Sequence, residues 1–235
     1  GVEQDDFMAG RGAALVGIFK SRYLKRFESS VHAFKISVRR AMAYLKTFES
    51  YFLDQKLIAS GDFHKALRYI EREDEEDDAT PRSLADEMDE SEEARQVLEG
   101  MEKVDTNKYN LRKIHDSLQK DITIFGEIWE RVKDIGPEQD EKLTRLKKML
   151  EFDLKGNKVL IFTYYKDTAR YLYQNLGHPG NEEAVKFKDS LGINVRRMDS
   201  GASPKERSRI VREFAPIANK REDVPGTERE IDILI

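Results

Sequence analysis

The sequence predicts an α/β fold with a large all-helical region, and two observations support this prediction. Apolar residues recur every three or four positions over much of residues 1–153, which is the period of an amphipathic helix. From residue 155 to residue 235, short β-rich apolar runs alternate with segments of helical spacing, as in a parallel sheet. We therefore expect a helical region over 1–153 and a partial α/β lobe over 155–235.

Long helices are predicted at residues 30–57 and 111–132, with shorter ones at 63–70 and 143–154. In the first of them a single apolar stripe is formed by Val31, Phe34, Val38, Met42, Leu45, Phe48 and Phe52. A helix with one apolar face must bury that face against another element. Long antiparallel helices that pack on each other are the simplest arrangement.

The negative charge of the chain is concentrated in residues 71–105, which hold 16 acidic and 4 basic side chains. Like charges repel one another, so this composition favours a solvated loop over a packed helix. We expect an acidic loop at about 71–105. The rest of the chain carries a small positive net charge, which is compatible with a polyanionic partner.

Strand-like runs occur at residues 159–162, 194–198 and 231–235. The first has the composition of a strand buried on both faces of a parallel sheet. A turn and a helix follow each of the first two runs, and a capping box with Ser203 and Glu206 opens the later helix. Because parallel sheets bind ligands outside the carboxyl ends of their strands, the two turns face the same edge and form one candidate site.

Polar residues gather at both turns. They are Thr163, Lys166, Asp167 and Thr168 at the first, and Ser200, Gly201, Ser203 and Lys205 at the second. Hydroxyl donors, lysines, a glycine that permits close backbone approach and two helix N-termini together suit a phosphate group. Ordinary helix capping uses the same residue types, so both interpretations stay open from the spacing alone.

These turns also carry a family resemblance. Residues 158–165 (KVLIFTYY) with 167–172 (DTARYL) resemble the motif that opens the second RecA-like lobe of superfamily-two helicases and Swi/Snf-type DNA translocases. Residues 197–214 (RMDSGASPKERSRIVREF) are similar to the following motif of that family. The resemblance covers residues 156–235. A further stretch, residues 10–12 with 24–30, resembles the link between lobes in members that have long helical insertions.

The resemblance implies a fragment of an ATP-dependent nucleic-acid motor that contributes backbone contacts without reading bases. The residues implied along the nucleic-acid backbone, including the second-turn lysine, are Thr163, Lys166, Ser200, Gly201, Ser203, Lys205 and Arg207. It implies double-stranded DNA and the N-terminal RecA-like lobe of the same parent as partners. ATP and Mg²⁺ are implied for the full-length protein, and the helical region would be an insertion between the lobes.

ATP hydrolysis needs a phosphate-cradling glycine-rich loop with its lysine and a magnesium-binding acid after a buried strand, and the sequence has neither. The acidic runs at 74–77 and 86–89 lack the preceding apolar strand. We therefore expect no catalytic residue and no bound cofactor in this segment. The four histidines are widely separated, which predicts no metal site: His32, His64, His115 and His178.

A second hypothesis comes from another class of protein: a non-enzymatic helical interaction module whose acidic loop docks a basic partner. The sequence also predicts no membrane segment, because its longest uncharged apolar runs are far shorter than a membrane span. The absence of cysteine fits the reducing cytoplasm.

Overall fold

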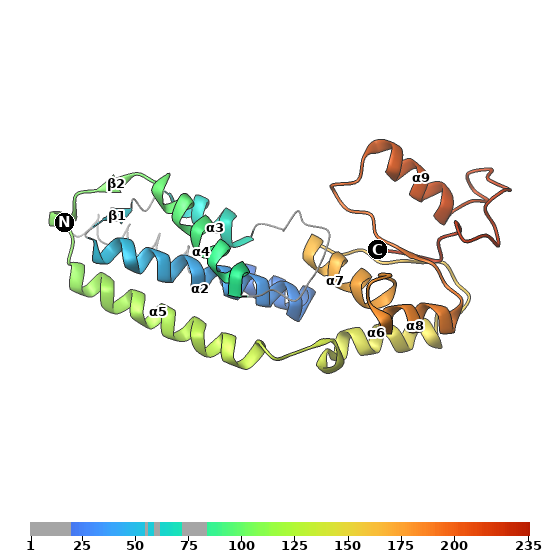
Figure 1. Ribbon diagram of the computed structural model, residues 1–235, viewed down its shortest axis with the longest axis horizontal. Coiled ribbons are helices and arrows are strands. Elements are labelled where there is room, and N and C mark those ends of the chain that lie inside the picture. Colours follow the sequence, from blue (N-terminus) through green and yellow to red (C-terminus); the bar gives the residue numbers. More distant parts are fainter. Residues whose placement is uncertain (1–19, 55, 59–61, 72–83) are drawn as a thin grey trace. The chain divides into compact units, whose positions relative to one another are not determined.

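The structure is a computed structural model that describes residues 20–54, 56–58, 62–71 and 84–235. The chain forms two compact units, residues 1–134 and residues 135–235. The predicted fold class is confirmed, since helices dominate the chain (Figure 1) and a small three-stranded parallel sheet is formed by strands between residue 159 and residue 234. No helix in the described ranges is long and apolar enough to cross a membrane. Residues 10–12 lie outside the described residues.

Helices build the first unit, and α2 is the element against which the others pack (Figure 1). A helix at residues 20–29 ends at Ser30, whose hydroxyl accepts a 3.0 Å hydrogen bond from the Ala33 N–H and so caps α2. The bounds are α2 Val31–Leu53, α3 Phe63–Glu71, α4 Leu84–Glu99 and α5 Leu111–Val132. The long helices predicted from the apolar spacing are thereby confirmed.

Two buried clusters hold these helices together. One contains Ala41 of α2, Tyr69 and Ile70 of α3, and Ala94 of α4. The other contains Tyr51, Ala66, Leu98 and Met101. Because α4 contributes to both clusters, it is part of the core of this unit.

The expected acidic loop is therefore wrong over residues 84–99, which form α4. Ala94 and Leu98 are fully buried, while Glu92 remains exposed and pairs with Arg95 at 2.5 Å. The helix forms because a narrow apolar face packs on α2 and α3, while the charged Glu92, Arg95 and Glu99 are exposed. Residues 72–83 lie outside the described part of the chain.

A short antiparallel pair, which the sequence did not predict, closes the end of the first unit. Strand β1 (Leu57–Ile58) pairs with β2 (Lys103–Val104), and Leu57 lies opposite Val104. The 3₁₀ turn η2 (Thr106–Lys108) then leads into α5.

A three-stranded parallel sheet organises the second unit, with strand order β3-β5-β4. Val159 of β3 and Val195 of β4 both lie in register with Ile233 of β5. The bounds are η3 Pro137–Gln139, α6 Glu141–Glu151, β3 Val159–Leu160, α7 Lys166–Leu176, α8 Glu182–Leu191, β4 Val195–Arg196, α9 Pro204–Phe214 and β5 Ile233–Leu234. The strands are shorter than the apolar runs that predicted them.

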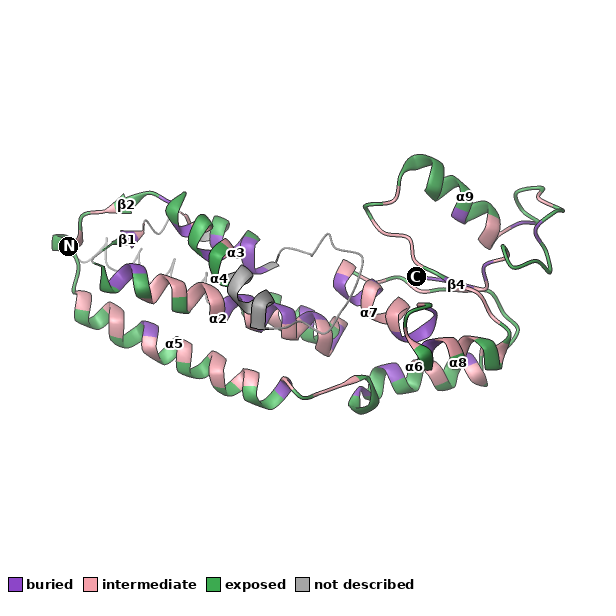
Figure 2. Cartoon of the chain, viewed as in Figure 1, coloured by how far each residue is buried: buried purple, intermediate pink, exposed green. Residues whose placement is uncertain are grey.

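Helices cover the two faces of this sheet unequally. One face packs on α6, α7 and α8 around a core that includes Leu143, Leu176 and Ile233. On the other face, α9 packs through Ile210 against Leu234, and most of its remaining surface is exposed (Figure 2). At Gly177 the end of α7 lies so close to β4 that a Cβ atom would approach Val195 Cβ within 2.5 Å.

The boundary between the units lies before α6, whereas the sequence placed it after this helix. Leu143 and Leu150 of α6 are buried in the core beside the sheet. Asp140 caps α6 and accepts a 3.0 Å hydrogen bond from the Tyr171 hydroxyl of α7. The apolar face of α6 thus packs in the core of the α/β unit.

Strand β3 differs from its prediction as well, because it lies at an edge of the sheet and is buried on one face only. Val159 and Ile161 pack against the core. Leu160 is 45% exposed and Phe162 is 87% exposed. Residues two apart along a strand share a face, so the face of β3 opposite the core is uncovered.

Candidate functional site

The two turns predicted as a candidate site lie at the same end of the sheet, where the parallel strands finish. Strands β3 and β4 both run parallel to β5, so the turns that follow them start from the carboxyl ends of the strands. Because β5 lies between β3 and β4, the two turns begin about 10 Å apart. Long side chains are needed to connect them.

Internal hydrogen bonds stabilise the first turn. The Thr163 hydroxyl donates a 3.1 Å hydrogen bond to the Tyr165 carbonyl, which also accepts from the backbone of Thr168 at the start of α7. Asp167 and Thr168 are 2% and 4% exposed, so they anchor the helix and do not present a surface to a ligand. Lys166, the first residue of α7, is the charged group of this turn that is not buried.

The second turn has the predicted cap. The Ser203 hydroxyl accepts a 3.2 Å hydrogen bond from the Glu206 N–H, and Pro204 is the first residue of α9. Upstream, Asp199 Oδ1 accepts from the Gly201 N–H at 2.9 Å, which tightens the chain between β4 and the helix. Lys205 is exposed on the first turn of α9.

Arg207 holds the second turn in shape. Its guanidinium donates from Nε to the Ala202 carbonyl and from Nη2 to the Ser200 carbonyl, both at 2.8 Å. A rigid guanidinium that satisfies two carbonyls fixes the loop geometry. Among the residues predicted along a nucleic-acid backbone, Arg207 and Ser203 therefore have internal partners that order the turn.

Lys166 connects the two turns. A Cβ atom built on Gly201 would lie 3.9 Å from Lys166 Nζ and 3.2 Å from Asp199 Oδ1. The ammonium group of the first turn therefore lies directly beside the backbone of the second turn. The structure thus brings Lys166 and Gly201 together, with Ser200 next in the chain.

Asp199 and Arg197 are structural partners that the sequence-based site did not include. Arg197 Nε lies 3.2 Å from Asp199 Oδ2, and both side chains are less than one-fifth exposed. The Arg197 guanidinium also lies 5.9 Å from the Tyr173 ring centroid. Their arginine–x–aspartate spacing at the end of a strand is the signal that could have indicated this ion pair. Arg197 thereby offsets the negative charge of Asp199 within the second turn.

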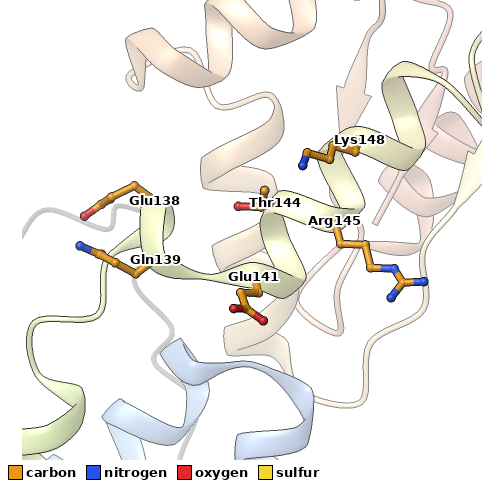
Figure 3. Close-up of a pocket in the computed structure, with 6 residues that line it drawn as sticks. All are labelled: Glu138, Gln139, Glu141, Thr144, Arg145 and Lys148. Carbon is orange, nitrogen blue, oxygen red and sulfur yellow. The ribbon is translucent and has the colours of Figure 1, made fainter.

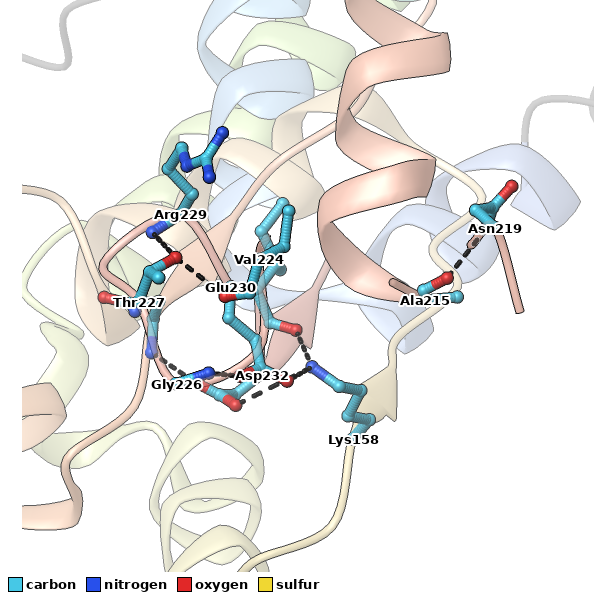
Figure 4. Close-up of polar contacts among 11 residues, drawn as sticks. Lys158, Ala215, Asn219, Val224, Gly226, Thr227, Arg229, Glu230 and Asp232 are labelled. Carbon is cyan, nitrogen blue, oxygen red and sulfur yellow. Dashed lines mark hydrogen bonds and ion pairs between the residues drawn. The ribbon is translucent and has the colours of Figure 1, made fainter. Parts of the chain in front are cut away.

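Lys158 lies at the opposite end of the sheet, where the strands begin (Figure 4). Its ammonium donates to the Ile231 carbonyl at 2.7 Å and lies 2.9 Å from Glu230 Oε1 and 3.9 Å from Asp232 Oδ1. The bond from Lys158 lowers the pKa of the Glu230 carboxyl. This cluster joins β3 to β5 and is internally paired.

A pocket of about 380 Å³ lies on η3 and α6, away from both turns in the chain (Figure 3). Its lining is Glu138, Gln139, Glu141, Thr144, Arg145 and Lys148. Acidic and basic side chains balance there, and it includes none of the predicted site residues.

No family model, no curated protein and no solved structure matches this chain. Among the residues that the structure describes, no group of three or more His, Asp or Glu side chains could hold a metal ion.

Proposed function

We propose that this chain is part of an ATP-dependent nucleic-acid helicase or translocase of the Swi/Snf type, in which its second unit supplies nucleic-acid-backbone contacts of the second motor lobe. The observation that carries the proposal is the position of Lys166 beside Gly201. Two phosphate-suited turns from separate strand–helix units meet at the carboxyl edge of a parallel sheet, as a track for a phosphate backbone requires.

In this proposal each residue of the edge has one of two roles. Lys166 and Lys205 supply positive charge to phosphates, and Gly201 lets the backbone approach closely. Thr163, Ser203 and Arg207 order the turns through the hydrogen bonds described above. Contacts to phosphates carry no base information, so binding is independent of sequence, and double-stranded DNA is the partner proposed.

ATP and Mg²⁺ belong, in this proposal, to a nucleotide site completed by the N-terminal RecA-like lobe of the same parent. The described residues do not fit such a site on their own, since they offer neither a phosphate-cradling loop nor a cluster of metal ligands. We therefore propose no ATP hydrolysis by this segment alone. The cytoplasm is the proposed compartment.

The test is DNA binding by the chain, measured as fluorescence anisotropy of a labelled duplex over a salt series. Lys166→Ala and Lys205→Ala should each weaken binding and reduce the salt slope by about 1. Lys186→Ala is the matched control, because Lys186 of α8 is a lysine of the same unit with a 77% exposed side chain. If both turn variants bind DNA as tightly as the Lys186→Ala control does, the two turns do not contact the phosphates of bound DNA.

An acidic helical interaction module is the second candidate, and α4 favours it. This helix buries Ala94 and Leu98. Over residues 91–99 the acidic Glu92, Glu93 and Glu99 outnumber the one basic residue, Arg95, so this part of the helix carries net negative charge. An oligolysine peptide that binds the chain, loses binding with Glu92→Lys and keeps it with Lys166→Ala would support this candidate.

A further inference from the structure

The solvent-facing side of α9 carries a row of basic side chains. Lys205, Arg209 and Arg212 are all exposed, and they follow one another at intervals of four and three residues. Residues at these intervals share one face of a helix. In the part of the chain that the structure describes, none of the three side chains has a hydrogen-bond or ion-pair partner. These three residues form the α9 basic face.

The packing of α9 explains why this face is exposed to solvent. Ile210 is 4% exposed and packs with Leu234 of β5, and Phe214, one turn later, packs against the same cluster. Successive residues of a helix are rotated by about 100°, so the basic face lies roughly 150° from the side that holds Ile210 and Phe214. Most of the surface of α9 is exposed (Figure 2). The apolar side anchors the helix and leaves the basic face in water.

The other charged groups of α9 do not belong to the basic face. Glu206 and Glu213 share a different side, roughly a quarter turn away. The Asp223 carboxylate, and to a smaller extent Glu213, raise the pKa of Arg221, so the charge of Glu213 acts on that arginine. Arg207 donates to two carbonyls of the second turn and is therefore not counted. The basic face thus combines three positive charges with no negative one.

The composition and length of this face favour a phosphate backbone over a protein partner. The centre of a protein interface is depleted of charge and enriched in apolar and aromatic residues. The remaining residue of α9 on this face is Ser208, whose hydroxyl is a group that contacts phosphates. Lys205 and Arg212 are about 10 Å apart along the helix axis. A DNA strand carries one phosphate per roughly 3.4 Å of its axis, so the face spans about three phosphate intervals.

We propose that the α9 basic face contacts the phosphates of duplex DNA, so that the DNA backbone continues along α9 from the second turn. Lys205 belongs both to that turn and to the basic face, which makes the two surfaces continuous. The inference rests on the proposed function, because it names where the same double-stranded partner lies beyond the two turns. Contacts of this kind read no bases and add affinity through the release of counterions.

The experiment measures binding of a labelled hairpin duplex by anisotropy over a salt series. Arg209→Ala and Arg212→Ala should each weaken binding roughly 3- to 10-fold at about 0.1 M salt and reduce the salt slope by about 1. Arg209→Lys and Arg212→Lys keep the charge and should keep the wild-type slope. Arg145→Ala is the matched control, because Arg145 is an exposed arginine of α6 in the same unit. It changes the net charge equally and should leave binding unchanged. Far-ultraviolet circular dichroism verifies that the variants keep their helices.

A second measurement reports contact itself. The chain has no cysteine, so Arg212→Cys places a single thiol on the basic face. A photoactivatable group attached to this thiol should crosslink to the duplex at saturating protein. Arg145→Cys with the same group should give no crosslink.

The outcomes separate this inference from the proposed function. If Lys166→Ala and Lys205→Ala weaken binding while Arg209→Ala and Arg212→Ala bind as Arg145→Ala does, the DNA stays at the two turns and the inference is overturned. If the α9 arginine variants lose binding and Lys166→Ala does not, the basic face contacts DNA and contact across the two turns is overturned. Equal losses for Arg145→Ala and the α9 variants would reflect net charge alone and also overturn the inference. If a labelled oligoglutamate binds and the duplex does not, the face docks an acidic protein and both proposals fail.

Discussion

The hydroxyl of Tyr171 donates a 3.0 Å hydrogen bond to Asp140 Oδ2, while Asp140 Oδ1 accepts from the N–H groups of Lys142 and Leu143 at 2.9 and 3.0 Å. One buried carboxylate thus caps α6 and ties it to α7. Burial, and then the Asp140 charge, raise the pKa of Tyr171, so its phenol stays protonated as a donor.

Asp140→Ala should destabilise the second unit by about 2 kcal/mol, because it removes a helix cap and leaves a partly buried hydroxyl without its acceptor. Tyr171→Phe removes only the second bond and should cost about 1 kcal/mol. Urea unfolding of both variants measures the difference. Equal losses for the two variants would show that the cap contributes nothing.

Under the proposed function, Gly201→Ala should weaken DNA binding several-fold with a change in stability below about 1 kcal/mol. The new methyl group would press on Asp199 Oδ1 at 3.2 Å, and it would occupy the space beside the Gly201 backbone that the proposal assigns to a phosphate. Anisotropy with the labelled duplex measures the effect. Gly126→Ala in α5 is the control, because nothing lies within 4 Å of its Cβ position; binding should be unchanged there.

Leu98→Ala should destabilise the first unit by roughly 2–4 kcal/mol, because Leu98 is fully buried where α4 meets α2 and α3. Glu92→Ala on the exposed side of α4 should change stability by less than about 0.5 kcal/mol. Thermal unfolding followed at the helical circular dichroism band compares them. Similar small effects would mean that α4 is not part of the core.

Alkaline pH should destabilise the first unit through Tyr44. Burial, and then the charge of Asp62, raise the pKa of Tyr44 to about 12. A group whose pKa is higher in the folded state contributes stability that is complete below its unfolded pKa, about 10, and is lost as the pH rises toward the folded pKa. Tyr44→Phe should therefore flatten the decline in unfolding free energy between about pH 10 and 12. A decline identical to that of the wild type would contradict this.

Much of the fold follows from apolar spacing, since α2 and α5 lie where period-3.6 stripes predict them. The sequence also predicted the Ser203 cap. It missed α4, because the charges of that helix outnumber the few apolar residues that pack it. Apolar spacing also could not predict that Arg26 and Arg40 are buried, each being 1% exposed. The Arg26 side chain is positioned by a hydrogen bond that it donates to the Ala33 carbonyl.

The candidate site could be predicted only in part. Parallel strands imply that the two turns share an edge, but the approach of Lys166 to Gly201 depends on β5 lying between β3 and β4. That order involves strands distant in the chain. The internal role of Arg207 depends on the path of the 199–203 turn, which no residue spacing specifies.

The pairing of Lys158 with Glu230 and Asp232 gives the sheet a direction for an approaching polyanion. At the amino ends of the strands, the Lys158 ammonium lies within 4 Å of two carboxylates, whereas at the other end of the sheet Lys205 is exposed on the first turn of α9. In the proposed function, a phosphate backbone that approaches the second unit is therefore attracted to the α9 side and not to the Lys158 side. Encounter is oriented before any contact forms, and the rate of association should fall with added salt more steeply than the rate of dissociation changes.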